Sequence, residues 1–490
     1  MDGYSVLTTC RGLKPVLVDC EQLDEGWSRD ATFDVCICGA GPAGITLARA
    51  LADKNRRVAL MEGGGLELSE ASQSLYYGES VGVPYPVDSS RLRYFGGASN
   101  HWLGETRALD DRDFEALSHH PLNRWPIRRL DLDDYAQQAA DILDLAPAAQ
   151  PFDIFNGRED AFKPIARRMS PPTLFGPKYQ HQLARSNLIW LCVNANLIDI
   201  ELEGSLRSVS QFSFRSYARA QPFTVRARCY VLCCGALENA RILLNANRQI
   251  PRGLGNQRDL VGRFFCEHID VSLGHMVMVS ALPRVSEYIP SDTLIRDRRC
   301  LSYVVRLSPV RDKDWPDGRC ETFPDRLSRA LREGGSACIN AEAEASVQQS
   351  ANRDSRVTLA RSKDRFGLRR LSLDWTLSDL DRHTIRTAAL ETGRALARHN
   401  LGRMRLAPYL EADIDTISDN CLGQSHHMCT TRMSDGPATG VVDRNCRLHG
   451  VENLYVGGSS VFASAGVSNP TYTIVKLALR LGDHLDGELG

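Results

Sequence analysis

The feature that most constrains the fold is a glycine-rich turn between an apolar run and a helical pattern. Residues 33–38, FDVCIC, form a nearly continuous apolar run typical of a strand buried on both faces, and GAGPAG follows at 39–44. Apolar residues at helical spacing come next, and a second apolar run, VALME, ends at Glu62. This order predicts a dinucleotide-binding βαβ unit, and therefore an α/β fold class with a Rossmann-like domain.

The glycines of this turn and the acid that follows have separate physical roles. Gly39 permits the tight turn, Gly41 lets the backbone approach a pyrophosphate at the helix N-terminus, and Gly44 lets helix and strand pack closely. Glu62 is expected to accept hydrogen bonds from a ribose. The pattern does not distinguish NAD from FAD, so an NAD-dependent dehydrogenase is one alternative.

Length and composition indicate a globular protein with two lobes and no polyanionic partner. A chain of 490 residues exceeds the usual size of one compact core. Charged residues make up 24% and the formal net charge is -1, so the chain has no basic excess for binding nucleic acid. Neither a secretory leader nor an apolar run of about 18 residues is present, which predicts a cytoplasmic protein without a membrane partner.

The cysteines do not form a recognisable framework. There are 15 of them, irregularly spaced and without a C-x-x-C pair. Such spacing indicates neither a disulfide scaffold nor a zinc ribbon, so most are expected to be small buried hydrophobic residues.

Two further stretches carry glycine-rich signals. Residues 91–106 read RLRYFGGASNHWLGET, in which the pair Gly96 and Gly97 suits a loop that presses backbone amides against a flat or charged ligand. Near the C-terminus, ENLYV at 452–456 reads as a buried strand leading into Gly457 and Gly458. The first of these stretches also reads as a tight turn closed by a buried tryptophan.

A helix is predicted over 471–485 from the spacing of its apolar residues. Ser468 or Asn469 is placed to cap it, and Pro470 fits its first position. The start of such a helix directs unpaired N–H groups and a partial positive charge at whatever precedes it, which suits an anion such as a reduced flavin.

Taken together, these motifs resemble those of the glucose-methanol-choline (GMC) family of FAD-dependent oxidoreductases, near its pyranose-oxidase branch. The matching motifs occur in the same order as in the family and span most of the chain: GAGPAG, GGASNHW, CCGALENARILL, LVGRFFCEH, HHMCTTRM, and NLYVGGSSVF with NPTYT. The resemblance implies an FAD-binding domain assembled from residues 1–110, 185–275 and 421–490. It implies a substrate domain from 111–184 and 276–420, built on an antiparallel sheet with 371–375 in one strand.

The resemblance also implies the site residues. His426 carries over as the catalytic residue and Asn469 as its partner before the last helix. The residues implied to bind FAD are Gly39, Gly41, Pro42, Ala43, Gly44, Glu62, Gly63, Gly96, Gly97, Ser99, Asn100, His101, Val193, Gly458, Ser459, Pro470 and Thr471. His101 matches the residue that is covalently bonded to the flavin in the pyranose-oxidase branch, and acid precipitation of the coloured protein distinguishes the two modes of attachment.

The run SHHMCTTRM also allows other interpretations. A strand here would send His426 and His427 to opposite faces, leaving His427 as a hydrogen-bonded core residue. Adjacent strand residues do not converge on one ion, so no metal site is predicted from these histidines and Cys429. Cys429 stands where the family motif around the catalytic histidine usually has glycine. Its side chain is expected to narrow the space near the flavin or to shift the strand.

The prediction is therefore an FAD-dependent enzyme that oxidises an alcohol to a carbonyl on a small polyhydroxylated substrate such as a sugar, cyclitol or natural product. Oxygen or another acceptor takes up the electrons, and no oligomeric state is implied. One alternative is non-oxidative chemistry at the flavin site, such as a lyase or rearrangement reaction. A distant one is a serine hydrolase, because GESVG at 78–82 matches the G-x-S-x-G nucleophile word with Ser80 as nucleophile.

Overall fold

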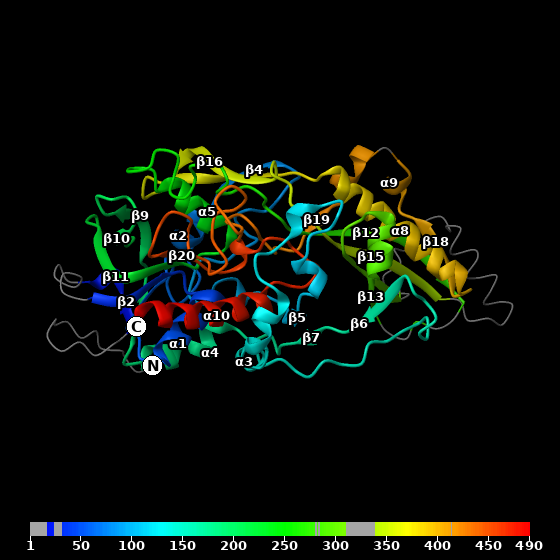
Figure 1. Ribbon diagram of the computed structural model, residues 1–490, viewed down its shortest axis with the longest axis horizontal. Coiled ribbons are helices and arrows are strands. Elements are labelled where there is room, and N and C mark those ends of the chain that lie inside the picture. The colour runs from blue at the N-terminus through cyan, green and yellow to red at the C-terminus, as the bar shows by residue number, and fades with distance from the viewer. Residues whose placement is uncertain (1–16, 24–31, 280–281, 283–284, 310–338, 413) are drawn as a thin grey trace.

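Two large β-sheets organise the molecule, and they lie at opposite ends of its long axis (Figure 1). The computed structural model describes residues 17–23, 32–279, 282, 285–309, 339–412 and 414–490. The α/β fold class with a Rossmann-like sheet and an antiparallel sheet is confirmed.

The first sheet, here the nucleotide sheet, has eight strands, and its core is parallel in the order β1-β8-β3-β2-β11. β20 pairs parallel with β11, while β10 and β9 extend the sheet in antiparallel fashion. The strands are β1 (Leu17–Asp19), β2 (Thr32–Cys38), β3 (Val58–Met61), β8 (Ile189–Val193), β9 (Asn196–Leu202), β10 (Val209–Arg215), β11 (Phe223–Leu232) and β20 (Leu454–Val456).

The predicted βαβ unit is β2, α1 (Pro42–Ala52) and β3, with the glycine-rich turn between β2 and α1. All four residues of β3 are buried, as expected for a parallel strand covered on both faces. The last helix, α10 (Thr471–Leu489), packs along α1, and the two helices lie side by side in Figure 1.

The second sheet is antiparallel at every registered pair, in the order β18-β12-β15-β14-β13-β6, with β19 beside β12. α8 (Asp379–Arg398) packs against β12, β15 and β18. The strands are β6 (Phe162–Ile165), β12 (His268–Met278), β13 (Ser286–Pro290), β14 (Tyr303–Pro309), β15 (Ile339–Gln348), β18 (Gly402–Leu406) and β19 (Leu422–Gly423).

A small third sheet joins β16 (Arg356–Lys363), β17 (Arg369–Trp375) and β4 (Gly78–Gly82). The predicted strand over 371–375 is therefore present, but its expected place in the large antiparallel sheet is wrong. β17 instead pairs in parallel with β4, because its buried Leu371, Leu373 and Trp375 pack into the core between the sheets. A two-stranded ribbon consists of β5 (Glu105–Thr106) and β7 (Arg168–Met169).

The remaining helices are short and connect these sheets: α2 (Glu70–Gln73), α3 (Ala136–Ile142), α4 (Phe175–Ala184), α5 (Ala236–Asn245), α6 (Asp292–Arg298) and α9 (Pro408–Glu411). The division into two domains stays a prediction. The strands of the nucleotide sheet fall in its three expected segments, whereas β12 crosses the expected boundary at residue 275. Among the described residues, no helix is long and apolar enough to cross a bilayer.

A buried ion-pair cluster joins α5 to the turn between β16 and β17. Arg241 donates to Glu238 at 2.7 Å and also pairs with Asp364. All three side chains are almost fully buried. We predict that Arg241→Met costs about 3–5 kcal/mol of stability, because it leaves two carboxylates buried without their main cation.

Urea unfolding of the holoprotein measures this cost. Arg248→Met is the matched control, since Arg248 pairs with Asp199 at the surface, with 62% of its side chain exposed. That substitution should cost less than about 1 kcal/mol. Equal unfolding midpoints for the two variants would contradict the prediction.

Candidate active site

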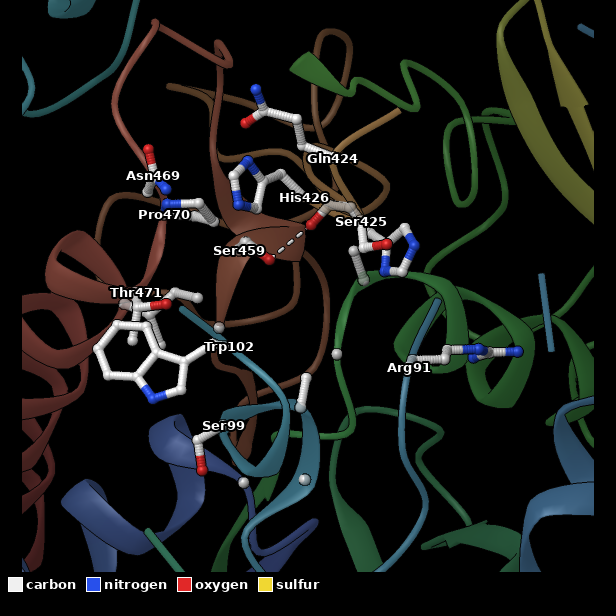
Figure 2. A pocket seen from close by; sticks show the side chains of 18 of the residues that line it. Arg91, Ser99, Trp102, Gln424, Ser425, His426, Ser459, Asn469, Pro470 and Thr471 are labelled. Atoms are coloured by element: carbon white, nitrogen blue, oxygen red, sulfur yellow. Dashed lines mark hydrogen bonds between the residues drawn. The ribbon is translucent and has the colours of Figure 1, made fainter. Parts of the chain in front are cut away.

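A cavity of about 1070 Å³ lies between the nucleotide sheet and the antiparallel sheet. One end is lined by the glycine-rich turn after β2, and the other by side chains of β12, β14 and β15. His426 and Asn469 line the same cavity, and Figure 2 shows their side chains near each other beside Pro470.

The three glycine-rich stretches meet at the first end of the cavity. Gly41 and Gly97 face each other so closely that a Cβ on Gly97 would lie 3.2 Å from the Cα of Gly41. Gly458 lies next to Ala43, and the amide of Gly96 donates to the carbonyl of Ala40 at 2.9 Å. Three segments far apart in the sequence therefore form one surface of exposed backbone at Gly41, Gly97 and Gly458, here called the cradle.

The cradle suits a pyrophosphate. α1 begins at Gly41 without a side-chain cap, which leaves the first amides of the helix free to bind an anion. Gly39 has a φ of +102°, and a Cβ there would lie 2.6 Å from the carbonyl oxygen of Cys233. A Cβ on Gly44 would lie 1.9 Å from the oxygen of Gly39, so only glycine permits this turn.

Glu62 follows β3 directly and is a buried acid at the wall of the cavity. Its carboxylate accepts from the amide of Ala40 at 2.8 Å and from the amide of Gly64 at 2.9 Å. Each carboxylate oxygen has a second lone pair, so hydroxyl groups of a bound nucleotide can still donate to it.

The start of α10 differs from the prediction. Pro470 is the N-cap and no side chain caps the helix, so the expected caps, Ser468 and Asn469, are wrong. Ser468 instead donates to the carbonyl of Ala108 at 3.0 Å, and Asn469 accepts from Arg167. The first amides of α10 therefore stay unpaired by side chains where Pro470 and Thr471 line the cavity.

The His-His segment is not a strand, which corrects a second prediction. Residues 424–427 have no strand structure, and Ser425 and Cys429 adopt left-handed conformations with φ of 62° and 71°. His427 nevertheless makes the expected structural contacts, with Nε2 3.1 Å from the hydroxyl of Ser90 and its ring against Tyr85. Both histidine side chains are partly exposed to the cavity.

His426 pairs with a second histidine, His268, which begins β12. Their Nδ1 atoms lie 2.9 Å apart, and Nε2 of His268 lies 3.4 Å from the carbonyl oxygen of Ala465. A carbonyl only accepts, so the hydrogen-bond network assigns the proton of His268 to Nε2 and makes its Nδ1 an acceptor. His426 must then carry its proton on Nδ1, which leaves its Nε2 as a free acceptor.

Burial keeps both rings neutral. Desolvation is the main cause that lowers the pKa of His426 well below its usual value, and electrostatic coupling to His268 is the next. Desolvation also lowers the pKa of His268 to about 4. An imidazole that is neutral near pH 7 and has a free nitrogen is equipped to act as a general base.

Glu267 holds the backbone of His426. Both of its carboxylate oxygens accept from the amide of His426, at 2.8 and 2.9 Å, and the hydroxyl of Tyr85 donates to one of them. Burial raises the pKa of Glu267 to about 7 despite these donors.

Arg167 fixes the orientation of Asn469. Its Nη1 donates to Oδ1 of Asn469 at 3.0 Å, so the Nδ2 group of Asn469 remains as the donor. A donor on Asn469 and an acceptor on His426 are complementary to the two hydrogen-bonding functions of one hydroxyl group.

Sequence comparisons show which known proteins this chain is similar to. A family model described as GMC oxidoreductase matches residues 351–478. The chain is 25% identical to 6'''-hydroxyparomomycin C oxidase of Streptomyces lividus, over 93% of this chain and 92% of that protein. It is 29% identical to paromamine 6'-oxidase of Streptomyces fradiae, over 54% of this chain and 46% of that protein. The stretch 351–478 is thus similar to the GMC oxidoreductases.

Solved structures share the fold of this chain. Pyridoxine 4-oxidase from Mesorbium loti superposes with a TM-score of 0.57 at 18% identity, covering 92% of this chain and 99% of that one. An FAD-dependent oxidoreductase from Chaetomium thermophilum gives a TM-score of 0.60 at 14% identity, covering 93% and 99%. These structures show the fold of this chain, and the sequence relatives named above are oxidases.

Most of the predicted site residues line the cavity. Four do not: Gly44 packs on Gly39, Gly96 packs on Asn100, Asn100 donates to the carbonyl of Phe95, and Val193 is buried in β8. Those that do are Gly39, Gly41, Pro42, Ala43, Glu62, Gly63, Gly97, Ser99, His101, His426, Gly458, Ser459, Asn469, Pro470 and Thr471.

Sequence reasoning missed His268, Glu267 and Arg167. Glu267 and His268 end the motif LVGRFFCEH, which resembles a family motif but was given no role for its glutamate and histidine. A histidine directly after a buried acid was therefore an available signal. Arg167 follows no motif, and only the fold brings it to Asn469.

The structure contradicts two interpretations of the sequence, one for Cys429 and one for Ser80. Cys429 does not line the cavity, because it is buried beside Cys266, so it does not narrow the substrate space. Ser80 lies within β4, where its hydroxyl accepts from the amide of Tyr85, and lacks the strand-turn-helix setting of a hydrolase nucleophile. Within the described ranges, no group of three or more His, Cys, Asp or Glu side chains is placed to hold a metal ion.

We predict that Glu267 controls the pH dependence near neutrality. As the pH falls through about 7, Glu267 takes up a proton and its hold on His426 weakens, so the rate of flavin reduction should fall. A second fall should come only well below pH 6.5, when His426 itself is protonated. In Glu267→Gln the first fall should disappear, and the rate should be on the order of 10-fold to 100-fold lower throughout.

Anaerobic stopped-flow measurements across pH 5–9 test this. Tyr85→Phe is the matched control, because it removes one donor to the carboxylate and should move the first fall to higher pH. A fall near pH 7 that persists unchanged in Glu267→Gln would assign it to another group.

Proposed function

We propose that this enzyme oxidises a CH–OH group of a small polyhydroxylated molecule to a carbonyl, with His426 as the general base. The single observation that carries this proposal is the chain from Ala465 through His268 to His426, which leaves Nε2 of His426 as an acceptor. Asn469 supports it, because its free Nδ2 donor is complementary to the same hydroxyl.

The residues of the cavity fit FAD. The free amides at the start of α1 and the facing glycines Gly41 and Gly97 would hold the pyrophosphate, and Glu62 would accept from the ribose. The unpaired amides near Thr471 would lie at the flavin end, where a helix N-terminus favours negative charge by about 0.3–1 kcal/mol. When bound, FAD supplies the acceptor of the hydride and of its two electrons.

The chain itself handles the proton and the geometry. Nε2 of His426 takes the hydroxyl proton as the carbon-bound hydrogen leaves with its electron pair, so the alcohol becomes a carbonyl. Nδ2 of Asn469 donates to the hydroxyl oxygen and holds the reacting carbon in position. Glu267 and His268 act as positioning residues through the backbone and the ring of His426.

The substrate is proposed to be sugar-like. Two curated relatives are named as oxidases of hydroxyparomomycin and of paromamine, and a structural neighbour as an oxidase of pyridoxine. A panel of paromamine, pyridoxine, glucose and myo-inositol therefore covers the chemistry. Bleaching of the flavin under anaerobic conditions indicates oxidation, whereas turnover without bleaching indicates lyase or rearrangement chemistry. Exposure to air then distinguishes oxygen from another acceptor.

We predict that His426→Ala lowers the rate of flavin reduction by on the order of 10²-fold to 10⁴-fold, because the proton acceptor is lost. The variant should retain its FAD, since His426 lies outside the cradle of α1. Stopped-flow absorbance and the ratio of flavin to protein provide the two measurements.

His427→Ala serves as the control for the neighbouring ring. His427 bonds Ser90 and packs on Tyr85, so its loss should lower the rate far less than the loss of His426. If His427→Ala abolished the reduction and His426→Ala left it intact, the roles of the two histidines would be reversed.

A further inference from the structure

The substrate end of the cavity has a floor made of three neighbouring strands. Across β12, β15 and β14, Asp270 pairs with Ser346 and Ser346 with Val304. In the next row, Ser272 pairs with Glu344, and Glu344 with Arg306. All six side chains line the cavity, because residues two apart on a strand share one face.

The arginines at this end are already neutralised by two glutamates. Arg167 pairs with Glu287 at 2.9 Å and with Glu105 at 3.0 Å. Arg306 pairs with the same Glu287 at 3.0 Å and with Glu105 at 3.6 Å. Two cations and two anions thus form one closed cluster with no net charge.

Asp270 and Glu344 remain outside this cluster. Neither makes an ion pair with any residue in the part of the chain that the structure describes. Asp270 accepts from the side-chain amide of Gln424, which also donates to Ser346 at 3.0 Å. Glu344 is exposed to the cavity. The floor therefore carries two carboxylates without an ion-pair partner among the described residues, set among hydroxyl and amide groups, and Arg306 is the cation that acts on both.

Asp270 and Glu344 lie at fixed distances from His268, which contacts the proposed base His426. His268, Asp270 and Ser272 follow one another on the same face of β12. At about 3.3 Å per residue, Asp270 lies roughly 7 Å beyond His268 along the strand, and the row of Glu344 roughly 13 Å beyond it. Gln424, two residues before His426, donates to Asp270 and so connects this carboxylate to the histidine segment. Figure 2 shows the side chain of Gln424 near that of His426.

We propose that Asp270 and Glu344 select a substrate that carries ammonium groups, so that the enzyme acts on an amino-bearing polyol such as an amino sugar. This inference rests on the proposed function and specifies its substrate class. The ammonium groups bind the two carboxylates, and hydroxyl groups bind Ser272, Ser346 and Gln424. The oxidised carbon then lies several bonds away from the amines, at His426 and Asn469.

The test compares paromamine with its fully N-acetylated form, which keeps the hydroxyl groups but loses the positive charges. Binding to the anaerobic holoenzyme is read by equilibrium dialysis, and oxidation by flavin bleaching. Paromamine should bind to the wild-type enzyme at least about tenfold more tightly than its N-acetylated form, and this difference in affinity should shrink at high salt.

The double variant Asp270→Asn, Glu344→Gln should remove that difference in binding between the two ligands. Glu79→Gln, an exposed acid on β4 outside the cavity, is the matched control and should change nothing. Equal binding of the two ligands to the wild-type enzyme, or an unchanged preference in the double variant, would overturn the proposal.

The two proposals fail in different ways. If the amine binds through the carboxylates but no alcohol of the panel bleaches the flavin, the ammonium site stands and the alcohol oxidation falls. If alcohols bleach the flavin at rates and affinities that are independent of charge, the oxidation stands and the ammonium site falls.

Discussion

The structure of the active site depends on the contact between His268 and His426. The two Nδ1 atoms meet at 2.9 Å although 158 residues separate them in the sequence. His268 begins β12 of the antiparallel sheet, while His426 lies in the C-terminal segment that returns to the nucleotide sheet. The contact therefore joins the part of the molecule that holds the cradle to the part that forms the substrate floor. Glu267 reinforces it, because one buried carboxylate binds the amides of both histidines.

Maintaining neutral buried imidazoles has a thermodynamic consequence. The pKa of His427 falls to about 3 and that of His268 to about 4, with desolvation as the main cause in both. Each unit of such a shift corresponds to about 1.4 kcal/mol of preference for the neutral ring. In acid the unfolded chain gains protons on these histidines that the folded chain resists, so they favour unfolding as the pH falls below their ordinary pKa. A base that stays neutral is thus obtained at some cost in acid stability.

The sequence predicted the features that depend on local pattern. The βαβ unit and the helix that begins at 471 follow from spacing, and the structure contains both. The resemblance implied that the glycine-rich stretches share one site, and the structure brings them together. The errors arose where tertiary contacts override local preference. Ser468 does not cap α10 because its hydroxyl bonds Ala108, and 371–375 leaves the expected sheet because β4 offers a parallel partner. Arg167, Asp270 and Glu344 could not be found, because their role depends on strand register and on which charges already cancel.

Cys429 shows how the backbone of the site is fixed despite local strain. Its φ of 71° is a conformation in which a residue with a side chain costs on the order of 1–3 kcal/mol, which explains why glycine suits this position. Flanking backbone hydrogen bonds hold it there: Met428 exchanges two with Cys266, and the amide of Cys429 donates to Ser459 at 3.1 Å. These bonds tie the histidine segment to the strand start at Glu267 on one side and to the cradle at Gly458 on the other. Because the thiol packs beside Cys266, away from the cavity, the strained residue orients His426 without occupying substrate space.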